Sequence, residues 1–274
     1  MSPAWLRYDL ETATVSPHLY RLLAEATGRV LAAGAAGDAF FVHTPDGIRL
    51  RSSALDDTAD TAWRLALAAA ERRGWLRAWR PVTHEPHQVG LGGPGPMASA
   101  HRVFTADTVA WLGYHSDTER PAPTVERWAM SVLMIRALVA AAGHTGWEHG
   151  DLWDRIRQPG GMRSGQQRPG RMGHPADPAV RRVAIAVRAG WDDPDLLRER
   201  LSDEQRLLLD TYEAAVRSAA AGWRAAPVPG AARRHGVALS VLFHWNRSGM
   251  PAHHRHLLAT ALAGAPLPHL SLAA

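Results

Sequence analysis

The stretch FFVHTPDGIRLR, residues 40–51, decides the fold. Two runs rich in aromatic, β-branched and aliphatic residues flank residues 44–47, and the Pro-Asp-Gly within that interval is typical of a tight turn. The stretch therefore predicts two short strands joined by a turn. In the second run Arg49 and Arg51 alternate with apolar neighbours, which places both arginines on one face of the strand.

The segments before and after this strand pair predict two helices and two further strands. Residues 5–10 are strand-like, and Ser16-Pro17 supplies an N-cap and a first-turn proline for a helix that runs to Gly34. A second helix is predicted over residues 57–73 and a further strand over residues 75–83. The order β-α-β-β-α-β predicts a ferredoxin-like antiparallel sheet with helices on one face.

The rest of the chain reads as helical. Residues 87–99 are rich in glycine and proline and predict a loop. Residues 158–178 predict a second, long loop, which is either a lid or peptide-binding arm or a solvated insertion. We predict an α+β protein with a single domain over residues 1–274, in which an α+β part (1–90) and a mainly helical part (98–274) enclose one cleft. The predicted helices are 105–116, 124–142, 147–157, 178–189, 203–225, 237–246 and 251–263.

Composition restricts the function classes. The 274 residues include no cysteine, which excludes disulfides, thiolate metal sites and a cysteine nucleophile. All 31 basic residues are arginine, and the formal charge of +5 favours acidic partners, because guanidinium groups grip carboxylates with two hydrogen bonds. The N-terminus does not resemble a secretory signal and no stretch is long enough to cross a bilayer, so we expect a cytoplasmic protein that does not bind membranes.

Generic motifs do not identify a reaction. The glycine-rich run at residues 90–95 lacks the strand-to-helix context of a phosphate loop, and no Gly-x-Ser-x-Gly elbow occurs. The histidines at 253, 254 and 256 are neighbours on a predicted helix and point in different directions, so no metal site is predicted. The basic residues do not form a nucleic-acid reader motif, and nucleic acid is not an expected partner.

The C-terminal stretch SVLFHWNR, residues 240–247, is similar to the closing motif of the lantibiotic-dehydratase C-terminal domain family, written roughly His-Met-His-x-Asn-Arg. Residues 40–51 resemble the strand pair of that family, which ends in His-Leu-Arg-Leu-Arg. Residues 128–131 and 147–157 resemble the middle helices of the family. The resemblance therefore covers nearly the whole chain.

The resemblance implies one of two activities. The family contains glutamate-elimination domains, which make dehydroamino acids, and stand-alone pyridine synthases of thiopeptide pathways. When the motifs are aligned on Asn246-Arg247, the first histidine of the closing motif falls at Leu242, and the histidine that precedes the paired arginines of the strand motif is also missing. These departures, and the absence of a large N-terminal glutamylation region, favour a pyridine synthase that joins two dehydroalanines and expels the leader peptide. A stand-alone elimination enzyme and a non-catalytic leader-binding module remain as alternatives.

The resemblance also implies a site without metal or cofactor, whose partner is a modified precursor peptide carrying a leader. Three polar residues of the closing motif would donate hydrogen bonds and transfer protons, and four further residues would bind substrate or leader. Structural roles remain open for several of them, as a helix cap, an ordinary strand face or core. The catalytic candidates are Ser240, His244 and Asn246, and the binding candidates are Arg49, Arg51, Trp245 and Arg247.

Overall fold

A computed structural model describes residues 4–83, 94–117, 124–144, 147–157, 178–226 and 229–263. The chain divides into two compact units, residues 1–122, here called the N-terminal unit, and residues 123–274, here called the helical unit. The four described strands belong to the N-terminal unit, and every element described in the helical unit is a helix. The predicted α+β class, with an antiparallel sheet before a helical half, is confirmed.

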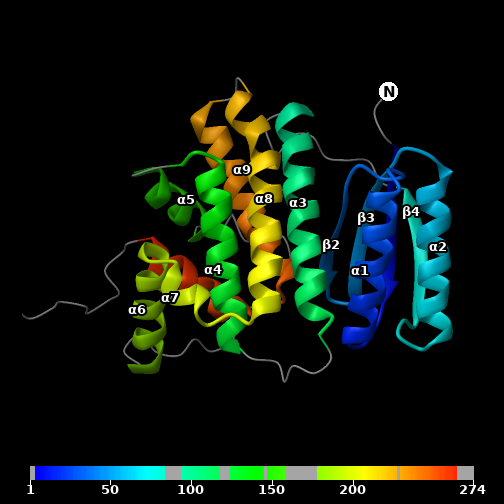
Figure 1. The fold of residues 1–274 in the computed structure, drawn as a ribbon, viewed down its shortest axis with the longest axis horizontal. Coiled ribbons are helices and arrows are strands. Elements are labelled where there is room, and N and C mark those ends of the chain that lie inside the picture. The colour runs from blue at the N-terminus through cyan, green and yellow to red at the C-terminus, as the bar shows by residue number, and fades with distance from the viewer. Residues whose placement is uncertain are drawn as a thin grey trace, which may run out of the picture. The chain divides into compact units, whose positions relative to one another are not determined.

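The N-terminal unit contains a four-stranded antiparallel sheet in the order β2-β3-β1-β4. This is the ferredoxin-like arrangement that the sequence predicts, and Figure 1 shows its two helices on one side of the sheet. The last strand begins three residues later than predicted. The elements are β1 (Ala4–Glu11), α1 (Pro17–Ala32), β2 (Ala39–Thr44), β3 (Gly47–Ala54), α2 (Asp57–Arg72) and β4 (Ala78–Thr83).

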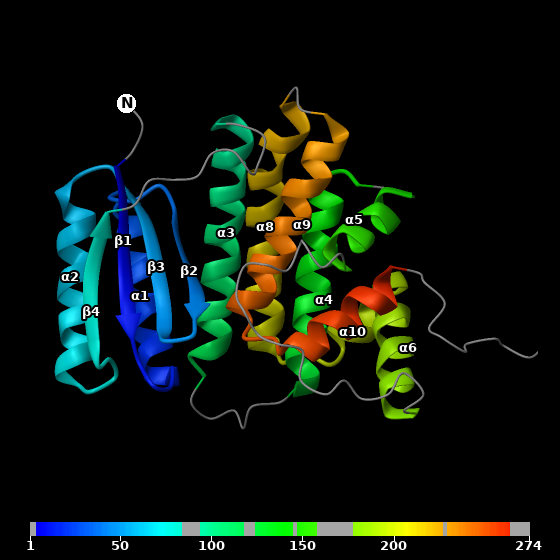
Figure 2. The ribbon, with the colours of Figure 1, turned by 180° about the vertical axis from the view of Figure 1, so that it is seen from behind.

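The two faces of the sheet differ in polarity because side chains alternate along each strand. Tyr8 and Leu10 of β1 lie opposite Leu50 and Ile48 of β3, and all four side chains are buried. The Tyr8 hydroxyl donates to Asp60 of α2, so this is the helix-covered face. Figure 2 shows the strands from the other side, in front of α1 and α2. That opposite face carries the arginines of β1, β3 and β4.

Gly47 closes the turn between β2 and β3. Its φ of +145° lies in a region that L side chains rarely adopt, and an added Cβ would stand 2.2 Å from the carbonyl oxygen of Leu10. Only glycine fits so close to the neighbouring backbone. The Pro-Asp-Gly signal therefore reflects a contact with β1 as well as a tight turn.

Helix α3 (Pro94–His115) also belongs to the N-terminal unit and packs beside β2 and α1. The hydroxyl of Thr105 accepts a hydrogen bond from the backbone N–H of Ala39 at 3.1 Å, and Thr108 does the same for Phe41 at 3.3 Å. These two donors point away from β3 along the outer edge of β2. The helix thus satisfies an edge strand that would otherwise expose its backbone groups.

The predicted loop over residues 87–99 is wrong for residues 94–99, which form the first turns of α3; residues 87–93 lie outside the described part of the chain. Proline is accepted in a first helical turn, where the missing N–H would have no intrahelical acceptor. The Pro-Gly-Pro run at residues 94–96 therefore starts a helix. Composition alone suggested a loop because it does not show where a helix begins.

The helical unit is built around α4 (Thr124–Ala141), which packs most extensively on α8. Residues 129–135 of α4 are all buried, which explains the unbroken apolar run in the sequence. A short helix, α7, was not predicted, and the proposed lid lies outside the described residues except for residue 178. The other elements are α5 (Trp147–Arg157), α6 (Pro178–Asp192), α7 (Asp195–Arg198), α8 (Asp203–Ala225), α9 (Gly230–Arg247) and α10 (Ala252–Leu262).

Helix α9 begins seven residues before the predicted start at Val237. Arg234, in the added turns, forms ion pairs with Asp151 and with Glu148 of α5, the latter at 3.2 Å. These contacts between helices hold the early turns of α9 despite the glycines at 230 and 236, which lower helix propensity. None of the helices described is long and apolar enough to cross a bilayer.

Candidate functional site

The closing motif occupies the C-terminal half of α9. Ser240, His244, Trp245 and Arg247 are buried, and Asn246 is half-buried. The helix turns different members of the motif toward different neighbours, because α9 packs against both α4 and α5. The sequence-predicted residues of this helix therefore do not all share one environment.

His244 is held by a side chain from another helix. Its Nε2 lies 2.8 Å from the hydroxyl oxygen of Ser131 on α4, and both residues are buried. A hydrogen bond in such a low-dielectric setting fixes the orientation of the imidazole ring. The arrangement can therefore present a positioned proton donor or acceptor, which is what general acid–base catalysis requires.

Ser240 lies one turn before His244, as the spacing predicts, but its hydroxyl bonds locally. Ser240 Oγ donates to the carbonyl oxygen of Gly236 at 2.9 Å. This donation leaves the lone pairs of the hydroxyl oxygen as acceptors. Asn246 lies near the C-terminal end of α9, and its backbone carbonyl accepts from Gly249 N–H at 3.0 Å.

Trp245 and Arg247 lie in the interior of the helical unit. The indole ring of Trp245 stacks on Trp153 of α5, with ring centroids 6.2 Å apart and planes 28° apart. Arg247 has no exposed surface. This placement gives Trp245 a core-packing role, and its predicted contact with substrate remains a prediction.

Arg49 and Arg51 lie on the face of the sheet opposite α1 and α2. Asp9 of β1 accepts hydrogen bonds from Arg7, at 3.0 and 2.8 Å, and from Arg49, at 2.9 Å. Arg80 of β4 is 3.9 Å from the same carboxylate. Burial tends to raise the pKa of Asp9, but the hydrogen bonds and charges of Arg7 and Arg49 outweigh it and hold the pKa below its ordinary value.

We call these five residues, Arg7, Asp9, Arg49, Arg51 and Arg80, the arginine face. The face holds four guanidinium groups, of which those of Arg7, Arg49 and Arg80 lie within 4 Å of the one carboxylate, so it keeps an excess of positive charge. Burial, together with repulsion from Arg49 and Arg7, lowers the pKa of Arg51 to about 10, and Asp9 opposes that shift. Arg51 stays charged at neutral pH. Its Nε atom is buried and has no hydrogen-bond partner among the residues that the structure describes, whereas the side chain as a whole is partly exposed.

Sequence reasoning missed two residues that hold candidate site residues in place, Asp9 and Ser131. Asp9 becomes recognisable only when the strand register sets it opposite Arg49 and beside Arg7. Ser131 carried a detectable signal, because it is a hydroxyl inside the apolar run of α4, and a buried hydroxyl requires a partner. No group of three or more His, Cys, Asp or Glu side chains that could hold a metal ion occurs within the described ranges.

Comparison with known proteins agrees with this architecture. The tRNA-dependent lantibiotic dehydratase MibB from Microbispora sp. 107891 is 19% identical, with a TM-score of 0.64; the match covers 96% of this chain but only 28% of MibB. The pyridine synthase TbtD from thiomuracin biosynthesis is 14% identical, with a TM-score of 0.51, and the match covers 95% of this chain and 96% of TbtD. At these identities the likeness shows the fold.

No curated protein matches the sequence of this chain. A family model does match: residues 5–265 fit the family described as "Lantibiotic biosynthesis dehydratase C-term". That range includes both β2–β3 and the closing motif of α9. The chain therefore belongs to the lantibiotic biosynthesis dehydratase C-terminal family.

Proposed function

We propose that this protein is a pyridine synthase that closes a six-membered nitrogen ring between two dehydroalanines of a modified precursor peptide and releases the leader peptide. Membership of the dehydratase C-terminal family supports the broader role, which is the enzymatic modification of ribosomally made peptides. Family membership does not distinguish ring formation from glutamate elimination, and the proposal goes beyond it by choosing ring formation.

One observation carries that choice. Positions 47 and 242, which align with histidines of the elimination motifs, hold glycine and leucine. Gly47 is buried at the start of β3 and has no side chain, and Leu242 is buried on α9. Neither position supplies a side chain that can accept or donate a proton, so an elimination that relies on those two histidines has lost its acid–base groups.

The proposed reaction needs positioning and proton transfer. One dehydroalanine and its preceding amide tautomerise to an azadiene, and the alkene of a second dehydroalanine adds to it with formation of two carbon–carbon bonds. Loss of water and loss of the leader as a peptide amide then give the aromatic ring. The sum is substrate to pyridine, water and leader amide, with no net oxidation.

The described residues suit these needs in two places. The arginine face offers guanidinium donors for peptide carbonyls and carboxylates. The Ser131–His244 pair offers an oriented imidazole for the proton transfers of tautomerisation and elimination. Holding two distant parts of one peptide together can contribute up to roughly 7–11 kcal/mol in favourable cases, so binding is itself part of the catalysis.

The test is a single incubation of the purified chain with a leader-bearing peptide that contains two dehydroalanines, followed by mass spectrometry. We expect two products, a macrocycle and a leader amide, whose summed mass is one water short of the starting peptide. A control incubation uses a glutamylated serine peptide. Loss of glutamate from that control, without ring closure of the first peptide, would establish the elimination alternative. Return of both peptides unchanged, with measurable binding, would establish a leader-binding module.

Replacing Arg51 by alanine is expected to weaken binding of the precursor peptide by about fivefold to tenfold at low salt, and by less at physiological salt, because the lost contact is a charge-assisted hydrogen bond on a partly exposed face. Arg49→Ala should act in the same direction, with an added cost from the loss of one partner of Asp9. Fluorescence anisotropy of a labelled leader peptide measures both.

The matched control is Arg72→Ala, which removes an exposed arginine from the last turn of α2, outside the arginine face. Equal affinities for Arg51→Ala, Arg49→Ala and the control would show that the arginine face is an ordinary strand surface and that the peptide binds elsewhere.

A further inference from the structure

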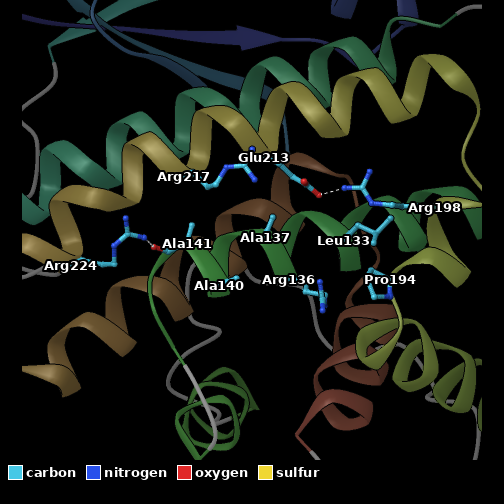
Figure 3. A pocket seen from close by; sticks show the side chains of 10 residues that line it. All are labelled: Leu133, Arg136, Ala137, Ala140, Ala141, Pro194, Arg198, Glu213, Arg217 and Arg224. Atoms are coloured by element: carbon cyan, nitrogen blue, oxygen red, sulfur yellow. Dashed lines mark hydrogen bonds and ion pairs between the residues drawn. The ribbon is translucent and has the colours of Figure 1, made fainter.

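The helical unit carries a pocket of about 360 Å³ lined by residues of α4 and α8, by Arg198 of α7 and by Pro194. Figure 3 shows the side chains that line it. The lining residues of α4 include Ala137, Ala140 and Ala141, which are small and leave room above the helix. This volume falls in the range of sites that bind small ligands or individual side chains of a partner.

Charge distinguishes this pocket from an ordinary surface groove. Its lining contains four arginines, Arg136, Arg198, Arg217 and Arg224, and a single carboxylate, that of Glu213. Arg198 is paired with Glu213 and also contacts Asp210 at 2.9 Å. The only lining carboxylate is therefore already engaged, and the remaining guanidinium groups leave the pocket positive.

Two of the other arginines are fixed by backbone carbonyls. Arg136 Nε donates to the carbonyl oxygen of Trp191 at 2.9 Å, and Arg224 donates to the carbonyl oxygen of Ala141 at the end of α4. Each bond orients one side of a planar group that has five N–H donors in all. The guanidinium groups are thus held in place while donors remain for a ligand.

Arg217 differs from the other three lining arginines because none of its donors is engaged by a described residue. It is exposed on α8, and no hydrogen bond or ion pair joins it to another residue within the described ranges. Arg217 and Arg224 are seven positions apart on one helix, which corresponds to roughly 10 Å along its axis. Two carboxylates seven residues apart on a ligand helix, or three residues apart on a polyproline-II segment, would lie on one face of the ligand and match this separation.

We propose that this pocket binds carboxylate side chains of an acidic peptide segment, with Arg217 and Arg224 as the two anchors. Guanidinium groups match carboxylates in shape and charge. The methylene groups of the ligand's acidic side chains would pack on the alanines of α4. A nucleic-acid backbone would make no use of this apolar floor. The inference rests on the proposed function only in taking a peptide as the partner.

The test is the affinity of the intact chain for a fluorescein-labelled, proline-rich peptide of polyproline-II conformation with two glutamates three residues apart, measured by anisotropy beside the same peptide with glutamines. We expect the glutamate peptide to bind more tightly. Arg217→Gln should weaken its binding about tenfold. Ala140→Trp, which fills the pocket at an exposed helix position without changing charge, should weaken it at least as much. Arg188→Gln, an exposed arginine on α6, is the matched control and should bind like the unaltered chain.

Equal binding of the two peptides, or unchanged affinity in both Arg217→Gln and Ala140→Trp, would overturn the proposal. An RNA hairpin that binds more tightly than the glutamate peptide and is weakened by Arg217→Gln would overturn it as well, in favour of a nucleic-acid site. The assay requires no turnover. A chain that binds the glutamate peptide through Arg217 but closes no ring would refute the proposed function and leave this pocket assignment intact.

Discussion

Replacing His244 by alanine is expected to slow ring formation by about 10²–10⁴-fold, the usual contribution of a positioned acid–base group, while leaving the affinity for the leader peptide nearly unchanged. The imidazole is oriented by Ser131 and lies in the family's closing motif, whereas we assign leader binding to arginines elsewhere on the chain. Single-turnover kinetics measured by mass spectrometry separate the chemical step from binding.

Loss of His244 also leaves the buried Ser131 hydroxyl without this partner, which costs about 1–3 kcal/mol of folding free energy. Thermal unfolding must therefore accompany the kinetics, and His244→Gln supplies a variant that retains hydrogen-bonding capacity. Ser131→Ala should give a smaller rate loss, because it removes the orienting group and leaves the imidazole. A folded His244→Ala or His244→Gln protein that turns over at the original rate would remove His244 from the mechanism.

Replacing Trp245 by alanine is expected to reduce the free energy of unfolding by about 3–5 kcal/mol, the usual cost of deleting a buried tryptophan. The cavity would open against Trp153, which stacks on Trp245 between α9 and α5. Trp147→Ala is the matched control. Trp147 is 71% exposed and contacts Arg234 only through its ring face, so its loss should cost no more than about 1 kcal/mol.

Urea denaturation of the two variants tests this assignment. If Trp245→Ala unfolds like the unaltered chain but raises the KM for the peptide, then Trp245 contacts the substrate, as the family resemblance suggests. A large loss of stability in Trp245→Ala with little change in Trp147→Ala would assign Trp245 to the core.

Much of the fold could be predicted because its signals are local. The alternation in residues 40–51, the turn at Pro-Asp-Gly and the cap at Ser16 each depend on neighbours in sequence, and the structure confirms the strands and the helix that they mark. The errors occurred where local signals were ambiguous. The glycines and prolines near residue 94 read as a loop, and the glycines at 230 and 236 hid the first turns of α9.

The sequence by itself determined the order of the strands and of the longer helices, the sharing of one strand face by Arg49 and Arg51, and the family motifs, since each depends on periodicity or adjacency along the chain. Only the tertiary structure decided the partners of those residues. Ser131 meets His244 across 113 positions, and Asp9 meets Arg49 across 40. Such pairs follow from strand register and from which helix faces pack together, and these are set by the burial of many side chains at once.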